Sequence, residues 1–145
     1  MPRQIHLTPE FIELAPPELK EGVLYVSMVH ACVIHRCCCG CGEKVVTPLS
    51  PAEWQLSYDG EAVSLHPSIG NSRFPCGSHY WVKRGRVVWV PKLTAAEAEA
   101  ARGFDRATRD AYVGSKSATL APAPQAQVAV TEKKRGFWRR LFWPG

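Results

Sequence analysis

The sequence predicts a mainly β protein of the α+β class, with a small antiparallel sheet, a cysteine knuckle, one C-terminal helix and a flexible tail. Short apolar runs rich in β-branched residues are separated by turn dipeptides such as Asp59-Gly60, which is typical of β-hairpins. Four cysteines fall within five consecutive positions directly after one of these runs. Further along, the pattern Thr94-x-x-Glu97 opens an alanine-rich segment and indicates the start of a helix.

The composition indicates one globular domain. The chain has 145 residues, of which 46% are hydrophobic and 21% charged, and this length is enough for a single core. No apolar run approaches the 18 residues of a membrane span, and the start of the chain lacks the pattern of a secretory signal. We therefore expect a cytoplasmic protein whose cysteines bind metal or act in catalysis rather than form disulfides.

The net charge of +5 is concentrated at the C-terminus. Residues 131–145 hold five basic residues and one acidic residue, which leaves only +1 for residues 1–130. A nucleic-acid-binding face is therefore not expected. The same tail has i, i+4 pairs, Phe137/Leu141 and Trp138/Phe142, which predict a short amphipathic helix. Such a helix would bind the anionic inner membrane surface, dock on a partner, or pack on the protein's own core.

The first part of the chain leads into the cysteine knuckle, which comprises residues 35–42. Residues 1–22 form a proline-rich lead-in, in which residues 10–14 predict one turn of helix or a lead-in strand. Residues 23–34 are apolar on both faces and predict one central strand buried on both sides. Residues 44–49 then form the return strand, so the knuckle is expected at a strand end.

Two hairpins are predicted after the knuckle. One pairs residues 54–58 with 61–65, and the other pairs residues 79–83 with 86–90 around Arg84-Gly85. A Pro/Gly/Ser/Asn-rich loop, residues 67–78, connects them. The predicted organisation is a lead-in 1–22, a metal-stapled β domain 23–93, a helix 94–113, a disordered linker 114–130 and the basic aromatic tail 131–145.

The cysteines predict a metal site, because structural zinc sites commonly take thiolate ligands from two separate chain segments. In an extended knuckle, Cys37, Cys39 and Cys41 would point to one side and Cys38 to the other. In a tight turn, Cys38-x-x-Cys41 is the competing pair. The second segment is Cys76-Gly77-Ser78-His79.

Two histidines leave alternatives open at this site. His79 would serve as a metal ligand, as a catalytic base, or as an ordinary residue at the start of a strand. His35 and Cys38 are alternative ligands. Cys32, in the middle of an apolar run, is expected to be a simple buried thiol.

Three motifs together resemble a family of small bacterial zinc-binding domains, formerly of unknown function. They are His-Arg-Cys-Cys-Cys-Gly-Cys-Gly, Ser-Leu-His-Pro-Ser-Ile-Gly-Asn and Cys-Gly-Ser-His-Tyr-Trp-Val-Lys-Arg-Gly-Arg-Val-Val-Trp, within residues 23–90. The family occurs in ubiquitin-like conjugation operons beside E1-like and E2-like enzymes and ubiquitin-like proteins. The resemblance implies a peptidase that processes or removes the ubiquitin-like protein, in the setting of antiviral defence.

The resemblance also implies roles for particular residues. Cys38 stands where the family has proline, which favours Cys37, Cys39, Cys41 and Cys76 as ligands of Zn²⁺. The candidate catalytic residues are Ser68 as nucleophile, with Ser78 as an alternative, and His79 as base. Asn71, Glu43 or a backbone carbonyl would orient the imidazole.

Two rival functions use the same residues. Three cysteines with an open fourth position would activate water, with Glu43 as general base. Alternatively, the protein is a noncatalytic zinc-binding adaptor that recruits an E2-like enzyme or a target, with an extended peptide adding to the edge of a hairpin.

Overall fold

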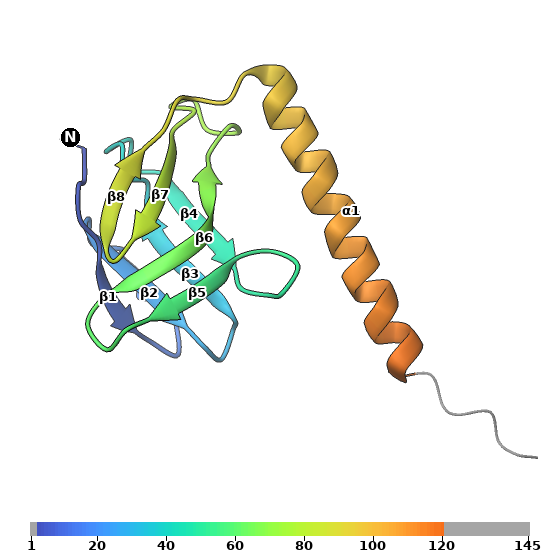
Figure 1. Ribbon diagram of the computed structural model, residues 1–145. Coiled ribbons are helices and arrows are strands. Elements are labelled where there is room, and N and C mark those ends of the chain that lie inside the picture. Colours follow the sequence, from blue (N-terminus) through green and yellow to red (C-terminus); the bar gives the residue numbers. More distant parts are fainter. Residues whose placement is uncertain (1–2, 121–145) are drawn as a thin grey trace, which may run out of the picture.

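The computed structural model describes residues 3–120 (Figure 1). Strands account for most of the regular structure, and one helix follows them. The elements are β1 Thr8–Phe11, β2 Val23–Ser27, β3 Cys32–Arg36, β4 Lys44–Pro48, β5 Gln55–Tyr58, β6 Val63–Gly70, β7 His79–Lys83, β8 Arg86–Trp89 and α1 Ala95–Leu120. The prediction of a mainly β protein with a C-terminal helix is confirmed.

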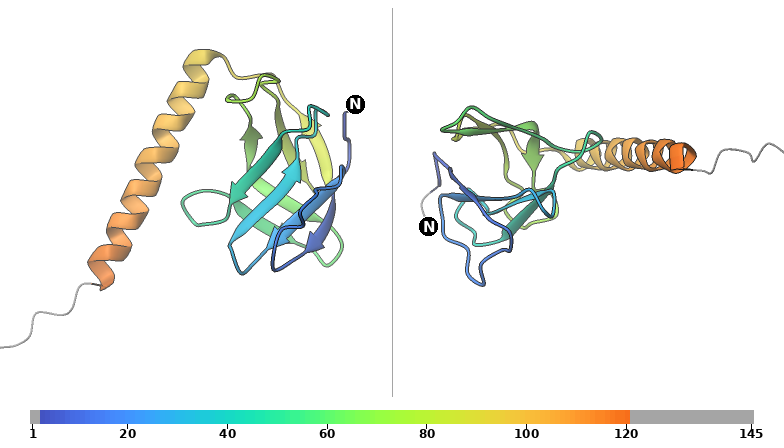
Figure 2. Two further views of the ribbon diagram at one scale, coloured as in Figure 1. Left: turned by 180° about the vertical axis from the view of Figure 1, so that it is seen from behind. Right: turned by 90° about the horizontal axis from the view of Figure 1, so that it is seen from below.

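The strands form two four-stranded sheets, with strand orders β1-β2-β3-β4 and β5-β6-β7-β8. Neighbouring strands are antiparallel, except that β1 and β2 are parallel. The sheets pack face to face (Figure 2), and apolar side chains from both fill one core. Fully buried members include Leu24 and Val33 from the first sheet and Val63, Tyr80 and Val82 from the second. The sequence did not show this division into two sheets.

The apolar run at residues 23–34 is a hairpin, so the prediction of one central strand is wrong. β2 and β3 pair antiparallel through Val26 and Val33, and the chain reverses at residues 28–31. Ser27 supports the turn, since its hydroxyl accepts a hydrogen bond from the N–H of His30. An apolar run alone does not reveal such a turn, because Met28 and Val29 are exposed in it although they are hydrophobic.

The loop predicted at residues 67–78 is too long, because β6 continues to Gly70. A register irregularity between Leu65 and Ile69 keeps Ile69 buried and paired with Tyr80. Pro67 is tolerated because it lies beyond the last residue of β6 that pairs with β5, which is His66. Ser68 therefore lies on a strand rather than in a loop.

The helix begins at the predicted capping box. The carboxylate of Glu97 accepts the N–H of Thr94, and the Thr94 hydroxyl accepts the N–H of Glu97. Its predicted end at residue 113 is wrong, because α1 continues to Leu120. The residues after 113 contain no proline until Pro122, and the Ser115 hydroxyl donates to the Tyr112 carbonyl within the helix.

Side-chain contacts connect α1 to the β4–β5 and β6–β7 loops. Arg102 donates to the Ser72 hydroxyl, Arg109 forms an ion pair with Glu53 at 2.7 Å, and Ala98 is buried. Within residues 3–120, no helix is long and apolar enough to span a membrane. The remainder of the predicted linker, residues 121–130, and the tail 131–145 lie outside the described residues.

Candidate active site and metal centre

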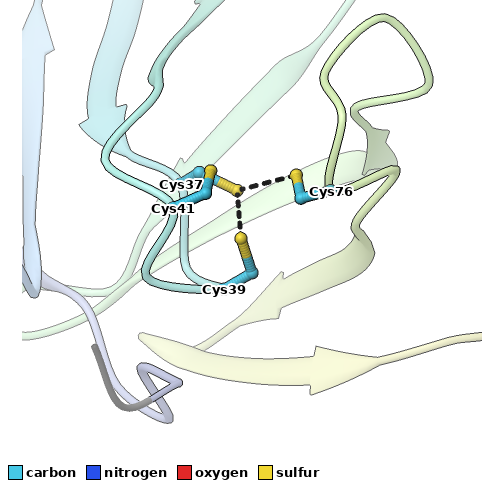
Figure 3. A group of neighbouring side chains, drawn as sticks. All are labelled: Cys37, Cys39, Cys41 and Cys76. Carbon is cyan, nitrogen blue, oxygen red and sulfur yellow. Dashed lines mark hydrogen bonds between the residues drawn. The ribbon is translucent and has the colours of Figure 1, made fainter.

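Four cysteines from two parts of the chain meet beside the core (Figure 3). Cys37 directly follows β3, Cys39 and Cys41 lie in the knuckle before β4, and Cys76 lies in the β6–β7 loop. Their Sγ atoms are all within 4.8 Å of one another. We call Cys37, Cys39, Cys41 and Cys76 the cysteine cluster.

The spacing of the cysteine cluster fits a metal ion and not a disulfide. Cys37 Sγ lies 3.5 Å from Cys39 Sγ and 3.9 Å from Cys76 Sγ, whereas a disulfide needs about 2.05 Å. Zinc bound tetrahedrally with Zn–S bonds of about 2.3 Å separates its sulfurs by about 3.8 Å. The cluster could therefore hold a metal ion with all four positions filled by thiolates.

The acidity of the thiols differs within the cluster. Burial raises the pKa of Cys39 and of Cys41. Burial also acts to raise the pKa of Cys76, but hydrogen bonds with Ser78, Cys39 and Cys41 outweigh it and lower the pKa to about 7. A cation among the four sulfurs would favour the thiolate form of all of them.

Polar side chains behind the cluster hold Cys37 in place. The Ser78 hydroxyl lies 3.1 Å from Cys37 Sγ, and Asn71 Nδ2 donates to the Ser78 hydroxyl at 2.9 Å and to Cys37 Sγ at 3.7 Å. Asn71 also donates to the Tyr80 hydroxyl at 3.4 Å. These contacts resemble the outer-shell hydrogen bonds that orient ligands at metal sites. Asn71 therefore does not orient the imidazole of His79.

The alternative ligands lie elsewhere. Cys38 is fully buried in the apolar core, and burial raises its pKa to about 12. His35 is also fully buried; its Nε2 lies 2.8 Å from the Tyr80 hydroxyl, and burial lowers its pKa to about 4. Neither residue belongs to the group of converging sulfurs.

Ser68 and His79 form a second polar pair. Ser68 Oγ lies 2.8 Å from His79 Nε2, and His79 Nδ1 lies 2.9 Å from the backbone oxygen of Pro91. A carbonyl only accepts hydrogen bonds, so Nδ1 carries the imidazole proton and donates to Pro91. Nε2 is then free to accept the Ser68 proton, and this order of nucleophile, base and orienting group is that of a serine hydrolase.

The register of β6 and β7 brings this pair together. Gly70 is the cross-strand partner of His79, and Ser68, two residues before Gly70, projects from the same face of β6. Gly70 and the imidazole lie close together, since a Cβ at Gly70 would be at an ordinary contact distance of 3.8 Å from His79 Cδ2. Glu43, another candidate orienting group, is exposed and contacts the knuckle through its carbonyl, which accepts the Cys37 N–H.

A cleft of about 530 Å³ gives access to the Ser68–His79 pair. One wall comes from β6 and β7, and the other from α1 and the segment before it. We call this the catalytic cleft, after the roles proposed below for Ser68 and His79. Its lining includes Trp54, Pro67, Ser68, Gly70, His79, Leu93, Ala98, Ala101 and Phe104.

The edge of β6 in the catalytic cleft is open. β5 pairs with β6 only as far as His66, and within residues 3–120 no other strand pairs with that edge. The Asn71 N–H donates to the Ser78 carbonyl across the β6–β7 register. Because hydrogen-bonding direction alternates along a strand, the N–H and C=O of Gly70 point away from β7 and toward the open edge.

The two sites are neighbours, and His79 borders the hollows of both. One is the catalytic cleft, and the other is a smaller hollow of about 310 Å³, which Cys39, Cys76 and Ser78 line. Ser78 contacts the cluster and His79 contacts Ser68, so adjacent residues connect the sites. No sequence signal showed that the Pro91 carbonyl would contact His79, or that Asn71 would contact Cys37. Both contacts join separate segments of the chain.

The comparison with known families found a match. A family model described as bacterial ubiquitination-like system serine protease (BubE) matches residues 11–90, more than half of the chain. The matched region contains Ser68, His79 and all members of the cysteine cluster. No curated protein and no solved structure matches the chain.

Proposed function

Because the chain belongs to the family of bacterial ubiquitination-like system serine proteases (BubE), we propose that Ser68 and His79 are its catalytic residues. The observation that carries this proposal is the relay from Ser68 Oγ through His79 to the Pro91 carbonyl, with distances of 2.8 and 2.9 Å. Ser78, the alternative nucleophile, is buried against the cysteine cluster instead.

In the proposed reaction, Ser68 Oγ attacks the carbonyl carbon of the scissile peptide bond while His79 Nε2 takes the hydroxyl proton. His79 then gives this proton to the leaving amine as the C–N bond breaks, which leaves an ester on Ser68. Water attacks the ester with His79 again as base, and His79 gives this proton to Ser68 Oγ as the ester C–O bond breaks and the carboxylic acid is released. The Pro91 carbonyl selects the tautomer of the neutral imidazole that carries its proton on Nδ1, and it accepts this hydrogen bond when His79 is protonated as well.

We propose that the substrate is an extended peptide, the C-terminal region of a ubiquitin-like protein, which the enzyme matures or releases. The open edge of β6 supports this, because the N–H and C=O of Gly70 offer one rung of strand pairing next to Ser68. E1-like and E2-like enzymes would share this ubiquitin-like protein as a partner. The protein would then act in the cytoplasm.

We further propose that the cysteine cluster binds Zn²⁺ as a structural ion. Four thiolates from two segments are typical of closed zinc sites, which keep no position open for a substrate or a water molecule. The ion would connect the β3–β4 knuckle of one sheet to the β6–β7 loop of the other. Its role would be to hold the loop of residues 71–78, which lies between Gly70 and His79.

The roles of Ser68 and His79 can be tested with purified variants and a ubiquitin-like precursor from the same pathway. We expect Ser68→Ala and His79→Ala each to lower kcat/KM by about 10³-fold or more, with zinc content and melting temperature unchanged. Ser57→Ala, at an exposed serine of β5, is the matched control and should cleave at the wild-type rate.

A fluorophosphonate probe provides a readout that does not depend on the choice of substrate. It should label the wild type and Ser57→Ala but not Ser68→Ala. If Ser68→Ala cleaves or is labelled like the wild type, Ser68 is not the nucleophile. Binding of the precursor by a wild-type protein that neither cleaves nor is labelled would support the adaptor function instead.

A further inference from the structure

A second hollow, of about 350 Å³, adjoins the catalytic cleft. The two share Gly70, Ser72, Arg102 and Asp105 in their linings, so they form one continuous depression between the β6–β7 region and α1. Four arginines line the second hollow, and we call it the arginine hollow. They are Arg73 from the β6–β7 loop and Arg102, Arg106 and Arg109 from α1.

The helix places its three arginines on one side. Positions 102, 106 and 109 follow the i, i+4, i+7 spacing of a single helical face. At a rise of 1.5 Å per residue they extend over about 10 Å, the length of roughly three residues of extended peptide. Arg73 faces them from the loop, so positive groups come from both walls.

Acidic residues of the protein balance this charge only in part. Glu99 pairs with Arg102 on the helix, Glu53 pairs with Arg109 at 2.7 Å, and Asp105 also lines the hollow. Hydrogen bonding and charge from Arg102 lower the pKa of Glu99, with smaller contributions from Arg106 and Arg73. Within residues 3–120, Arg73 and Arg106 form no ion pair of their own.

We propose that the arginine hollow is a substrate subsite that binds an acidic segment of the peptide whose scissile bond lies at Ser68. This inference rests on the proposed function and adds the chemistry of the substrate to it. A peptide that leaves the open edge of β6 at Gly70 enters the hollow directly, because Gly70 lines both spaces. Its Asp or Glu carboxylates would pair with Arg73 and Arg106, which need no internal ion pair to be broken.

Binding to the full-length Ser68→Ala protein tests the subsite without turnover. The probes are four fluorescein-labelled Gly/Ala decapeptides. Two carry three Glu, in the N-terminal or the C-terminal half, and the other two carry three Gln at the same positions. Fluorescence anisotropy measures their binding. We expect one Glu peptide to bind about tenfold more tightly than its Gln counterpart at 50 mM NaCl. The preference should shrink at 500 mM NaCl, because exposed charges are screened there.

Charge reversal tests which arginines cause the preference for Glu peptides. Arg106→Glu and Arg73→Glu, each in the Ser68→Ala background, should abolish the preference for Glu over Gln. The matched control is Arg86→Glu, at an exposed arginine of β8 outside the hollow, and it should keep the full preference. Equal affinity for all four peptides, or loss of the preference in Arg86→Glu alone, would overturn the proposal.

Two further measurements distinguish a failure of the subsite proposal from a failure of the proposed function. Fluorophosphonate labelling of Ser68 in the wild-type protein tests the proposed function by itself, because it does not use the peptides. If labelling is normal and the Glu preference is absent, the subsite proposal fails while the proposed function stands. A labelled decathymidylate that binds more tightly than either Glu peptide would show a site for nucleic acid and would also overturn the proposal.

Discussion

Gly70 lies directly across from His79 in the β6–β7 register, beside the proposed catalytic pair of Ser68 and His79. It lines both the catalytic cleft and the arginine hollow. A Cβ at this position would lie 3.2 Å from Leu93 Cδ1 and 3.8 Å from His79 Cδ2. The missing side chain therefore makes space for Leu93, which leads into α1, whereas a Cβ would meet the imidazole only at an ordinary contact distance.

We predict that Gly70→Ala reduces activity more than it reduces stability. The new methyl group must displace Leu93, and small displacements of a base or a cleft wall are costly to catalysis. We expect about a tenfold loss in kcat/KM on the precursor and a small change in melting temperature. Cleavage at the wild-type rate would contradict this view of Gly70.

Gly103→Ala is the control for this substitution. Gly103 lies inside α1, and a Cβ there meets no atom within 4 Å. The change should leave cleavage unaffected and should stabilise the helix by about 1 kcal/mol, because alanine is the better helix former. Circular dichroism at increasing temperature would measure the effect on the helix.

Among the secondary-structure elements, the β7–β8 hairpin fixes the N-terminal segment to the second sheet. The N–H of Leu7 donates to the Gly85 carbonyl at 2.7 Å, and the N–H of Gly85 donates to the Val63 carbonyl at 2.8 Å. Leu7 is fully buried in the shared core. The turn at Arg84-Gly85 therefore connects three segments as well as reversing the chain.

We predict that Gly85→Ala lowers the free energy of unfolding by about 2–4 kcal/mol. Gly85 has φ of 73°, which costs other residues about 1–2 kcal/mol. In addition, a Cβ would lie 3.0 Å from the Leu7 carbonyl oxygen and 3.0 Å from His6 Nε2. Urea unfolding of the two proteins measures the difference.

Comparison with Gly60→Ala isolates the packing contribution to the loss of stability in Gly85→Ala. Gly60 also has a positive φ, of 98°, but a Cβ there would meet nothing within 4 Å. This variant should lose only the conformational part, about 1–2 kcal/mol. Equal losses in Gly60→Ala and Gly85→Ala would mean that the contact with the N-terminal segment contributes nothing.

At the scale of the whole molecule, the cysteine cluster joins the two sheets at one end of the core. Cys37, Cys39 and Cys41 belong to the β3–β4 connection, and Cys76 belongs to the β6–β7 connection. A structural metal contributes its binding free energy to folding, because the unfolded chain has no preformed site. Metal binding should therefore stabilise both sheets together.

We predict one Zn²⁺ per chain, measured by elemental analysis of the purified protein. Removal of the metal with a strong chelator, or by Cys39→Ser or Cys76→Ser, should destabilise the whole β domain and abolish cleavage. Cys32→Ser is the matched control, since Cys32 is partly buried in β3 but lies outside the cluster. A metal-free protein with an unchanged melting temperature would contradict the structural role.

Features encoded within a few residues could be predicted from the sequence. The β7–β8 hairpin, the return strand after the knuckle and the capping box of α1 each depend on a short run of residues. The sequence also indicated that Ser68, His79 and the cysteine cluster were the residues of interest, the first two through the resemblance of their motifs to a known family. Their catalytic and metal-binding roles stay predictions.

Features that depend on contacts between distant segments required the tertiary structure. The turn at residues 28–31 and the extension of β6 through Ser68 depend on which partner each strand finds. The Pro91 carbonyl reaches His79, and Arg106 lies beside the catalytic cleft, only because β8 and α1 return to that side of the second sheet. Local propensity allows many arrangements equally, and strand pairing and packing select one of them. The sequence by itself therefore determined which residues form the candidate sites, and the tertiary structure decided their geometry.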